Sequence, residues 1–184
     1  MKELSLNVLD ITMNSVKAGA TLIEILIDET DTALTITIRD NGCGMTEEVV
    51  QQLANPFYTT RTTRKVGMGV PLLKLAAEQT GGHVSIVSDT VDEAPDSHGT
   101  TVTAVFDKTH LDFTPLGDMI PTITTLIQGS PDIDFVFRHT KPSGATELET
   151  AALREILGDG VSLAEFEVLQ WIDGYLREQY AASV

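Results

Sequence analysis

Four stretches of this chain alternate apolar and polar residues with a period of two, the pattern of strands that are buried on one face. The stretches are residues 21–29, 33–40, 83–89 and 100–107, which read TLIEILIDE, ALTITIRD, HVSIVSD and TTVTAVFD. An acidic loop joins the first stretch to the second, and another joins the third to the fourth. The pattern therefore predicts two hairpins.

Helical patterns lie before and between the hairpins. Residues 3–18 carry apolar side chains at helical spacing, and a second helix is expected to begin at Pro71, whose fixed φ suits the first helical position. Thr46 is the expected N-cap of a short helix, and residues 55–70 show neither period and are expected to form a loop. This order predicts an α+β fold over residues 1–109, a two-layer sandwich with a mixed sheet and helices on one face.

Residues 110–184 are expected to form a small C-terminal α/β appendage. It opens with an apolar stretch that prolines interrupt, which continues into a hairpin turning at residues 142–144 and then a short helix over residues 151–157. Ser162 and Glu165 form a capping box that opens a last amphipathic helix. The sequence of this appendage indicates no function.

Large apolar residues of the last helix are expected in the core, with an exposed stripe that forms a homodimer interface as the alternative. They are Phe166, Leu169, Trp171, Ile172 and Leu176. The cations Arg138 and Lys141 are expected to lie along the face of the hairpin, and docking of a partner protein is the alternative there.

The net charge of −15 over 184 residues limits the classes of partner. A nucleic acid would be repelled, because its binding depends on Lys and Arg that neutralise phosphates. We expect instead a partner protein, or a small ligand that brings its own metal ion. The single cysteine cannot form an internal disulfide, no apolar stretch is long enough to cross a membrane, and the first residues lack the apolar core of a signal peptide. These features favour a cytoplasmic protein with no membrane contact.

Two short motifs carry side chains suited to ligand binding. The hexapeptide DNGCGM places Asp40 beside Gly42 and Gly44 directly after a strand, and by itself it fits a simple turn as well as a ligand site. Asp10 and Asn14 are four residues apart in the first predicted helix and therefore share a face. Alone, such a pair is more often surface decoration than a site.

The loop over residues 55–70 brings cations and glycines to the start of a predicted helix. Glycine N–H groups, the positive end of a helix and nearby cations together can bind a triphosphate. The residues concerned are Arg61, Arg64, Lys65, Gly67 and Gly69. Alone, the motif is weak, because it lacks the lysine and hydroxyl of a Walker A loop.

In combination, these segments resemble the Bergerat-fold ATPase and kinase superfamily, which includes DNA gyrase, the heat-shock-90 chaperones, histidine kinases and MutL. DITMNSVKAGAT resembles the N box and DNGCGM the first glycine box, while NPFYTTR resembles the F box and GMGVPLLKLAAEQTGG the second glycine box of histidine kinases. HGTTVTAVF resembles the closing strand. The four boxes occur in the family's order within residues 3–107. The resemblance implies a histidine kinase-like ATPase domain with ATP and Mg²⁺ as cofactors.

The resemblance also implies which residues contact the base and the ribose. Asp40 would accept a hydrogen bond from the exocyclic amine of adenine. Gly42 and Gly44 would let the backbone pass close to base and ribose, where a Cβ would intrude. Thr100 or Thr101 in the closing strand would complete the adenine contact.

The resemblance further implies contacts to the metal and the phosphates. Asn14 would give a side-chain oxygen to Mg²⁺, an ion that keeps phosphates and waters as its other ligands. Asp10 falls where ATPase members carry a glutamate that polarises the attacking water. The remaining implied nucleotide contacts come from the F box and the glycine-rich lid: Phe57, Thr60, Arg61, Arg64, Lys65, Gly67 and Gly69.

Two departures from the family pattern concern turnover more than binding. Asp10 is one methylene shorter than the usual glutamate, which changes its reach to a nucleophile. Lys65 and Val66 stand where kinases commonly place another glycine, so a shorter and stiffer lid is expected.

Three functions remain open for a member of this kind. A histidine autokinase is not expected, because only 13 residues precede Asn14 and leave no room for the helical hairpin that bears the phosphorylated histidine. The first expectation is a kinase resembling the anti-sigma-factor serine kinases, in which Asp10 acts as base on a partner protein's hydroxyl. The alternatives are an ATPase whose nucleotide cycle switches a partner, and an adenine-nucleotide sensor without chemistry.

Overall fold

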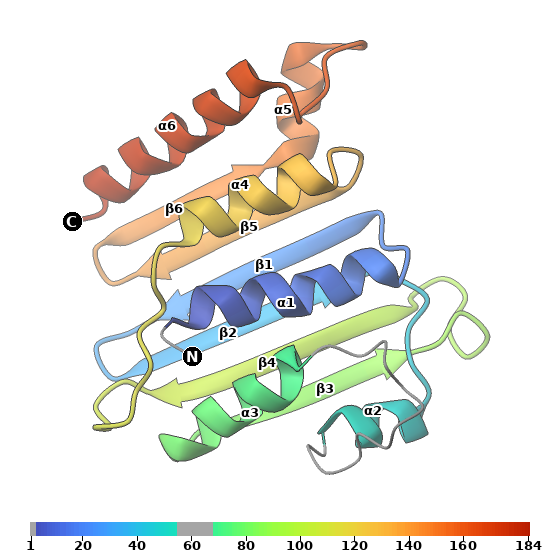
Figure 1. The fold of residues 1–184 in the computed structure, drawn as a ribbon, viewed down its shortest axis with the longest axis vertical. Helices are drawn as coiled ribbons and strands as arrows, with labels where there is room; N and C mark the ends of the chain where they lie inside the picture. The colour runs from blue at the N-terminus through green and yellow to red at the C-terminus, as the bar shows by residue number, and fades with distance from the viewer. Residues whose placement is uncertain (1–2, 55–67) are drawn as a thin grey trace.

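The computed structural model describes residues 3–54 and 68–184. Within them, a six-stranded sheet has the order β3-β4-β2-β1-β5-β6 (Figure 1). β5 runs parallel to β1 and the other neighbours are antiparallel, so the sheet is mixed as expected. The strands are β1 (Leu22–Glu29), β2 (Ala33–Asp40), β3 (His83–Asp89), β4 (Gly99–Asp107), β5 (Asp134–Lys141) and β6 (Gly144–Glu149).

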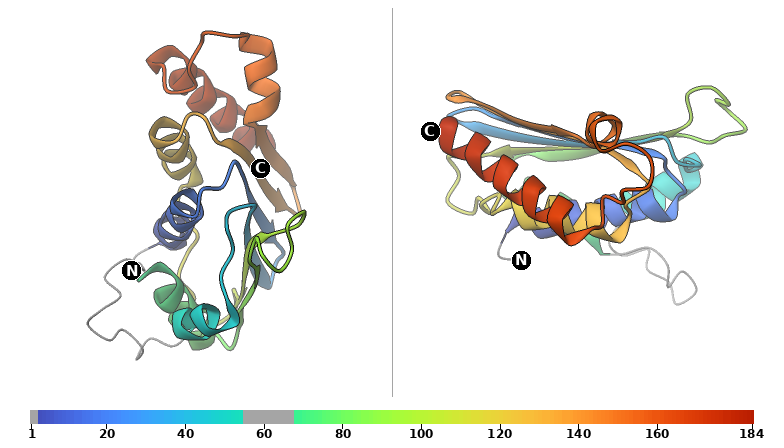
Figure 2. Two further views of the ribbon diagram at one scale, coloured as in Figure 1. Left: turned by 90° about the vertical axis from the view of Figure 1, so that its right-hand side faces the viewer. Right: turned by 90° about the horizontal axis from the view of Figure 1, so that it is seen from above.

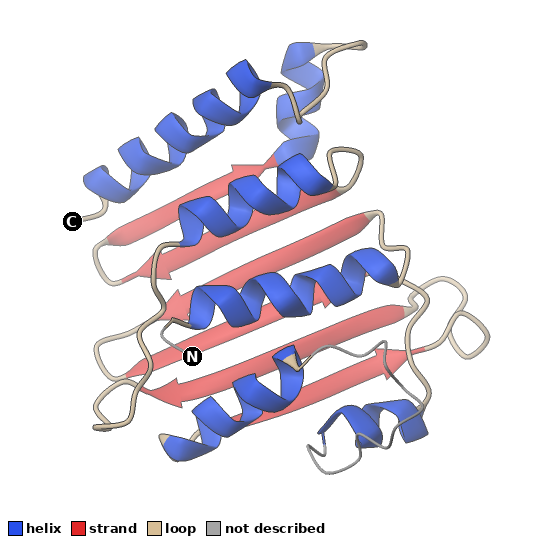
Figure 3. Ribbon diagram, viewed as in Figure 1, coloured by secondary structure: helices blue, strands red, loops and turns tan. Residues whose placement is uncertain are grey.

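The helices in the described part of the chain are α1 (Leu4–Lys17), α2 (Glu47–Ala54), α3 (Gly69–Gln79), α4 (Met119–Gly129), α5 (Thr150–Leu157) and α6 (Phe166–Ala182). All of them except α5 lie on one side of the sheet, and α5 lies beyond the β5–β6 edge, as Figure 2 and Figure 3 show. The predicted two-layer α+β sandwich is therefore confirmed. Among the described helices, none is long and apolar enough to cross a bilayer.

Period-two alternation in the strands forms the core between the two layers. Ile23 and Ile25 of β1 and Ile36 and Ile38 of β2 are at most 1% exposed and face the helices. Residues between them, such as Thr37, lie on the other face, which carries no helix in the described structure. One apolar face per strand fits a sheet covered on one side only.

Two helices begin differently from the expectation because proline is tolerated in the first turn. α3 starts at Gly69, two residues before Pro71. α4 occupies the stretch that we expected prolines to interrupt, and Pro121 lies in its first turn. N–H groups there have no partner within the helix, so proline removes no hydrogen bond. Asp118 caps α4 by accepting a hydrogen bond from the Ile120 N–H at 2.9 Å.

The last helix also differs in detail from its prediction. The Ser162 N–H donates to the Glu165 side chain as expected, but the Ser162 hydroxyl accepts from the Ala164 N–H and not from that of Glu165. This turn lies before α6, which begins at Phe166. Ile172 is fully buried, as predicted. The prediction was wrong for Phe166 and Trp171, which are 72% and 51% exposed because they lie off the face formed by the buried Val168, Ile172 and Leu176.

The C-terminal residues extend the sheet formed by the N-terminal residues. β5 pairs with β1 from Leu22–Asp134 to Asp28–Thr140. Phe135 and Phe137 of β5 are 2% and 1% exposed and belong to the same core cluster as the isoleucines of β1. The expected hairpin over β5 and β6 is confirmed, with Lys141 opposite Gly144 at its turn.

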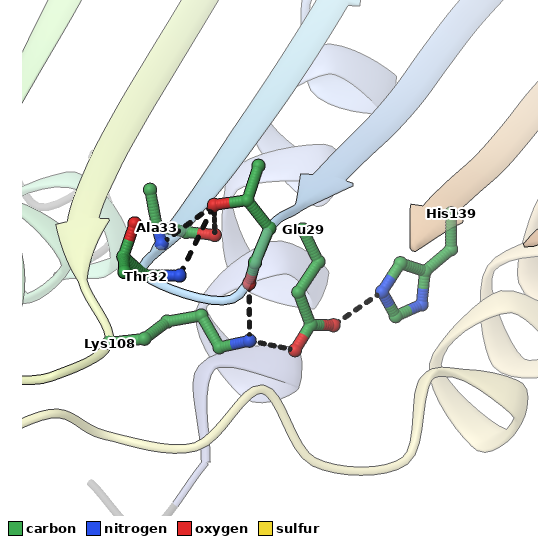
Figure 4. Close-up of polar contacts among 6 residues, drawn as sticks. Glu29, Thr32, Ala33, Lys108 and His139 are labelled. Carbon is green, nitrogen blue, oxygen red and sulfur yellow. Dashed lines mark hydrogen bonds and ion pairs between the residues drawn. The ribbon is translucent and has the colours of Figure 1, made fainter. Parts of the chain in front are cut away.

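A chain of partly buried polar contacts joins the C-terminal elements to the end of β1 (Figure 4). His139 of β5 lies 2.9 Å from both the Tyr180 hydroxyl and the Glu29 carboxylate, and Lys108 pairs with Glu29 at 2.7 Å. Because a carboxylate only accepts, Nε2 of His139 donates to Glu29 and Nδ1 of the neutral ring accepts from Tyr180.

The environment shifts the pKa values of three groups in this chain. Burial lowers the pKa of His139 although Glu29 opposes the shift, and burial raises the pKa of Tyr180 so that its hydroxyl keeps its proton. Burial alone would raise the pKa of Glu29, but hydrogen bonds from Lys108 and His139 outweigh burial and lower it. The network is therefore built for a neutral histidine between a phenol and an ionised carboxylate.

Acidification is expected to lower the free energy of unfolding. The pKa of His139 is below its ordinary value of 6.5 in the folded protein, so the unfolded chain binds the proton first and stability is lost as the pH falls below 6.5. Glu29 acts in the same direction below its ordinary value of 4.5. Denaturant unfolding of His139→Gln on either side of pH 6.5 should show a smaller pH dependence than the wild type. His83→Gln, at an exposed position, is the control, and equal pH dependence of both variants would contradict the assignment.

Candidate functional site

A cavity of about 220 Å³ lies between the helices and the sheet at the end of β2. Its walls are mainly apolar side chains from both layers: Ile11, Ile38, Val49, Leu53, Val70, Ile86 and Val102. The polar side chains that line it are Asn14, Ser15, Lys17, Asp40 and Thr100. A flat apolar ligand with a few polar edges fits such a lining.

Asp40 is the last residue of β2 and is the one buried carboxylate among the described residues. Its side chain is 9% exposed. One carboxylate oxygen accepts from the Ser15 hydroxyl at 2.5 Å and the other from the Gly42 N–H at 2.9 Å. A carboxylate has about four lone-pair sites, so acceptor capacity is left for a donor in the cavity.

The turn after β2 approaches neighbouring backbone too closely for ordinary side chains. A Cβ at Gly44 would lie 1.8 Å from the Asp89 carbonyl oxygen, and Gly44 has a φ of +71°. A Cβ at Gly42 would lie 2.8 Å from the Ala18 Cβ. Both glycines are therefore required by the fold of the turn, and Gly44 also lines the cavity.

The start of α3 packs directly on α1. A Cβ at Gly69 would lie 2.9 Å from the Asp10 Cβ, and the Asn7 side chain donates to the Gly69 carbonyl at 3.4 Å. Asn14 lines the cavity one turn of α1 beyond Asp10, which is exposed. The structure thus brings the N box and the second glycine box into contact.

The closing strand presents only one of its two candidate threonines to the cavity. Thr100 pairs with Asp40 across the β2–β4 ladder, and its hydroxyl lies 2.8 Å from that of Ser88. Thr101 is on the opposite face of the sheet, because successive strand residues alternate.

The predicted site residues therefore separate into groups. Asn14, Asp40, Gly44 and Thr100 line one cavity, and Gly42 adjoins it through its hydrogen bond to Asp40. Asp10 and Gly69 contact each other, and Thr101 lies elsewhere. The predicted contacts that fall outside the described residues are Phe57, Thr60, Arg61, Arg64, Lys65 and Gly67.

Three residues of α1 contribute to the site although the motif analysis did not select them. Ser15 donates to Asp40, Lys17 lines the cavity, and Asn7 contacts Gly69. Helical spacing was the available signal, because positions 7 and 14 are two turns apart and share the face of Asp10. For Ser15 no sequence signal existed, since its partner lies 25 residues away.

An oxygen-binding divalent ion is compatible with this lining. Among the described residues, no three His, Cys, Asp or Glu side chains converge as a metal cage. The Asn14 amide is a single oxygen ligand at the cavity, and Mg²⁺ commonly takes one or two protein oxygens with the rest from phosphates and water.

Comparison with known proteins gives a family and a fold. Residues 1–110 match the family model described as Histidine kinase-, DNA gyrase B-, and HSP90-like ATPase. The chain is 34% identical over 98 residues to tetrathionate sensor histidine kinase TtrS of Salmonella typhimurium, covering 53% of this chain and 16% of that protein. It is 29% identical over 101 residues to sensor histidine kinase YvrG of Bacillus subtilis, covering 52% of this chain and 16% of that protein. The chain thus spans less than a fifth of the length of these two relatives.

A solved structure shares the fold at low sequence identity. The Aquifex aeolicus MutL ATPase domain complexed with ADP superposes with a TM-score of 0.54 at 17% identity, covering 85% of this chain and 68% of that chain. The family model stops at residue 110. The likeness in fold therefore continues into the C-terminal residues.

Gly44→Ala is expected to destabilise the protein by on the order of 1–3 kcal/mol, because it adds a Cβ where φ is positive and a carbonyl is already in contact. Gly174→Ala in α6 is the matched control: nothing lies within 4 Å of its Cβ position, and alanine there should stabilise the helix by about 0.5–1 kcal/mol. Denaturant unfolding measures both. Equal stability of the two variants would show that the turn tolerates a side chain.

Proposed function

We propose that this chain, which belongs to the histidine kinase-, DNA gyrase B- and HSP90-like ATPase family, binds Mg²⁺–ATP and transfers the γ-phosphate to a partner protein. The family model confirms the superfamily expected from the four boxes, and an ATP-binding domain of this type is its defining part. The observation that carries the proposal is the buried Asp40 carboxylate, which faces an apolar cavity beside the glycine turn.

Adenine recognition by Asp40 follows from the hydrogen bonds it already makes. Ser15 and the Gly42 N–H both donate to it, so each carboxylate oxygen already acts as an acceptor. The exocyclic amine of adenine is a donor, whereas guanine presents a carbonyl at the same position. Apolar side chains such as Ile38 and Ile86 would cover the faces of the base.

The phosphates would extend along α1 toward the start of α3. Asn14 lines the cavity one turn from Asp10, and Gly69 begins α3 against Asp10. Unpaired N–H groups at a helix N-terminus favour anions. Asn14 would hold Mg²⁺, which when bound would offset phosphate charge.

Asp10 is the proposed base for the transfer. It is exposed, and it lies beside Gly69, where a phosphate chain bound at the α3 N-terminus would end. Its carboxylate would accept the proton from a serine or threonine hydroxyl of the partner as the phosphorus–oxygen bond forms and ADP leaves. The named kinases among the relatives support phosphoryl transfer.

An acceptor histidine within the described residues is not part of the proposal. Both ring nitrogens of the buried His139 are engaged, by Tyr180 and by Glu29. His98 uses Nδ1 toward the Gly42 carbonyl. Both histidines therefore make contacts within the fold.

A nucleotide-driven switch is the second candidate function. The fold shared with a MutL ATPase domain supports it, since hydrolysis with Asp10 activating water needs no acceptor protein. The exposed Phe166 and Trp171 of α6 would then offer an apolar contact to a partner or a second copy.

Asp40→Asn is expected to weaken ATP binding by about 100-fold or more, because the new amide group would turn a donor toward the adenine amine. The fold should persist, since an asparagine still accepts from the Gly42 N–H. Isothermal titration calorimetry measures the affinity. Asp31→Asn in the exposed β1–β2 loop makes the same charge change away from the cavity and should bind like the wild type. Unchanged affinity of Asp40→Asn would refute the adenine assignment.

Asp10→Asn is expected to retain ATP affinity and to lose phosphoryl transfer. The purified protein is incubated with γ-labelled ATP, alone and with cell extract, and label is followed on protein and as free phosphate. Label on another protein supports the kinase, free phosphate alone supports the switch, and neither would leave nucleotide sensing as the function. Equal turnover by wild type and Asp10→Asn would remove Asp10 as the base.

A further inference from the structure

We propose that His98 is a positioning residue for nucleotide binding, which holds the first glycine turn in its binding conformation from the side opposite the cavity. His98 Nδ1 lies 2.6 Å from the carbonyl oxygen of Gly42, although the two residues are 56 positions apart. The half-buried His98 is the last residue of the β3–β4 loop. It also lines a groove of about 750 Å³ that includes residues of the uncovered sheet face.

The contact has one chemical direction. A carbonyl oxygen only accepts hydrogen bonds, so Nδ1 of His98 carries the proton and donates. The β2–β4 ladder ends at Asp40. Gly42 lies beyond it, so its carbonyl has no partner on a neighbouring strand and takes its hydrogen bond from His98.

The peptide that His98 contacts is held at both of its ends. Its carbonyl accepts from His98, and its N–H, on Cys43, donates to the Ala18 carbonyl at 3.0 Å. Rotation of this peptide would break both hydrogen bonds. The peptide immediately before it is also fixed, because its N–H, on Gly42, donates to the Asp40 carboxylate.

The loop that carries His98 fixes the following peptide as well. The Val91 N–H donates to the Cys43 carbonyl at 3.2 Å, so both ends of the β3–β4 loop contact the same turn. Gly99, next to His98, has a φ of +140°, and a Cβ there would lie 2.0 Å from the Asp40 carbonyl oxygen. The end of this loop therefore packs directly against the backbone of Asp40.

The consequence concerns the base side of the nucleotide and rests on the proposed function. If Gly42 rotates, the Asp40 carboxylate loses the N–H that orients it, and the glycine backbone no longer matches the base and ribose. His98 is expected to act only through this turn. Loss of the hydrogen bond from His98 should therefore lower the affinities for ADP and for ATP by the same factor, since both nucleotides carry the same base and ribose.

The test compares two variants of similar volume, His98→Asn and His98→Leu, by calorimetry with ADP and with ATP. The amide nitrogen of asparagine is attached to Cγ as Nδ1 is in histidine, so it can donate to the Gly42 carbonyl, and leucine cannot. His98→Leu should lower the affinity for both nucleotides about fivefold, which is the effect of one hydrogen bond. The affinities of His98→Asn should stay within about twofold of those of the wild type. His83→Leu on β3, at an exposed position, controls for loss of a histidine.

Each result separates this inference from the proposed function. No binding by the wild type would refute the proposed function, whereas wild-type binding with equal affinities of His98→Leu and His98→Asn would overturn the role of His98. A loss for ATP alone would also overturn it, because it would place the effect at the phosphates. If His98→Leu does not fold, His98→Ala replaces it: alanine has no side-chain donor, so affinity equal to that of His98→Asn would overturn the inference.

Discussion

The burial of one carboxylate, that of Asp40, is the constraint around which the site is arranged. An ionised group that leaves water is costly unless donors replace the water. Ser15 from α1 and the Gly42 N–H from the following turn are those donors. The turn can supply its N–H only because Gly42 and Gly44 bring the backbone into positions that a side chain would block. Helix, strand and turn are thus tied together at one charged group that still has acceptor capacity.

The helix α1 links this carboxylate to the rest of the site through its two faces. One face, with Leu4 and Val8, is fully buried on the sheet. The adjoining face carries Asn14 at the cavity and Asp10 against Gly69. Because residues one and two helical turns apart stack along a face, a single rigid helix sets the spacing between the base end and the phosphate end of the site.

The C-terminal residues extend the sheet beside β1, and their polar contacts with β1 lie at the end of the strand remote from the site. Ile23 of β1 pairs with Asp40, whereas Glu29, near the other end of the strand, binds His139 and Lys108. β5 lies beside β1 along this whole length. A change at the polar chain of Glu29 and His139 would therefore act on the strand that flanks β2, which ends in Asp40.

The sequence by itself determined the layer architecture and several residues of the site, such as Asn14 and Asp40, and only the tertiary structure decided how they meet. Alternation in the strands and helical spacing in α1 are local consequences of backbone geometry, so they predicted the sandwich and put Asp10 and Asn14 on one face. Contacts between distant segments have no such local signature. Examples are the pairing of β5 with β1 and the hydrogen bond from His98 to Gly42. The same holds for α4, where proline suggested an interruption, because only its place in the first turn makes it harmless.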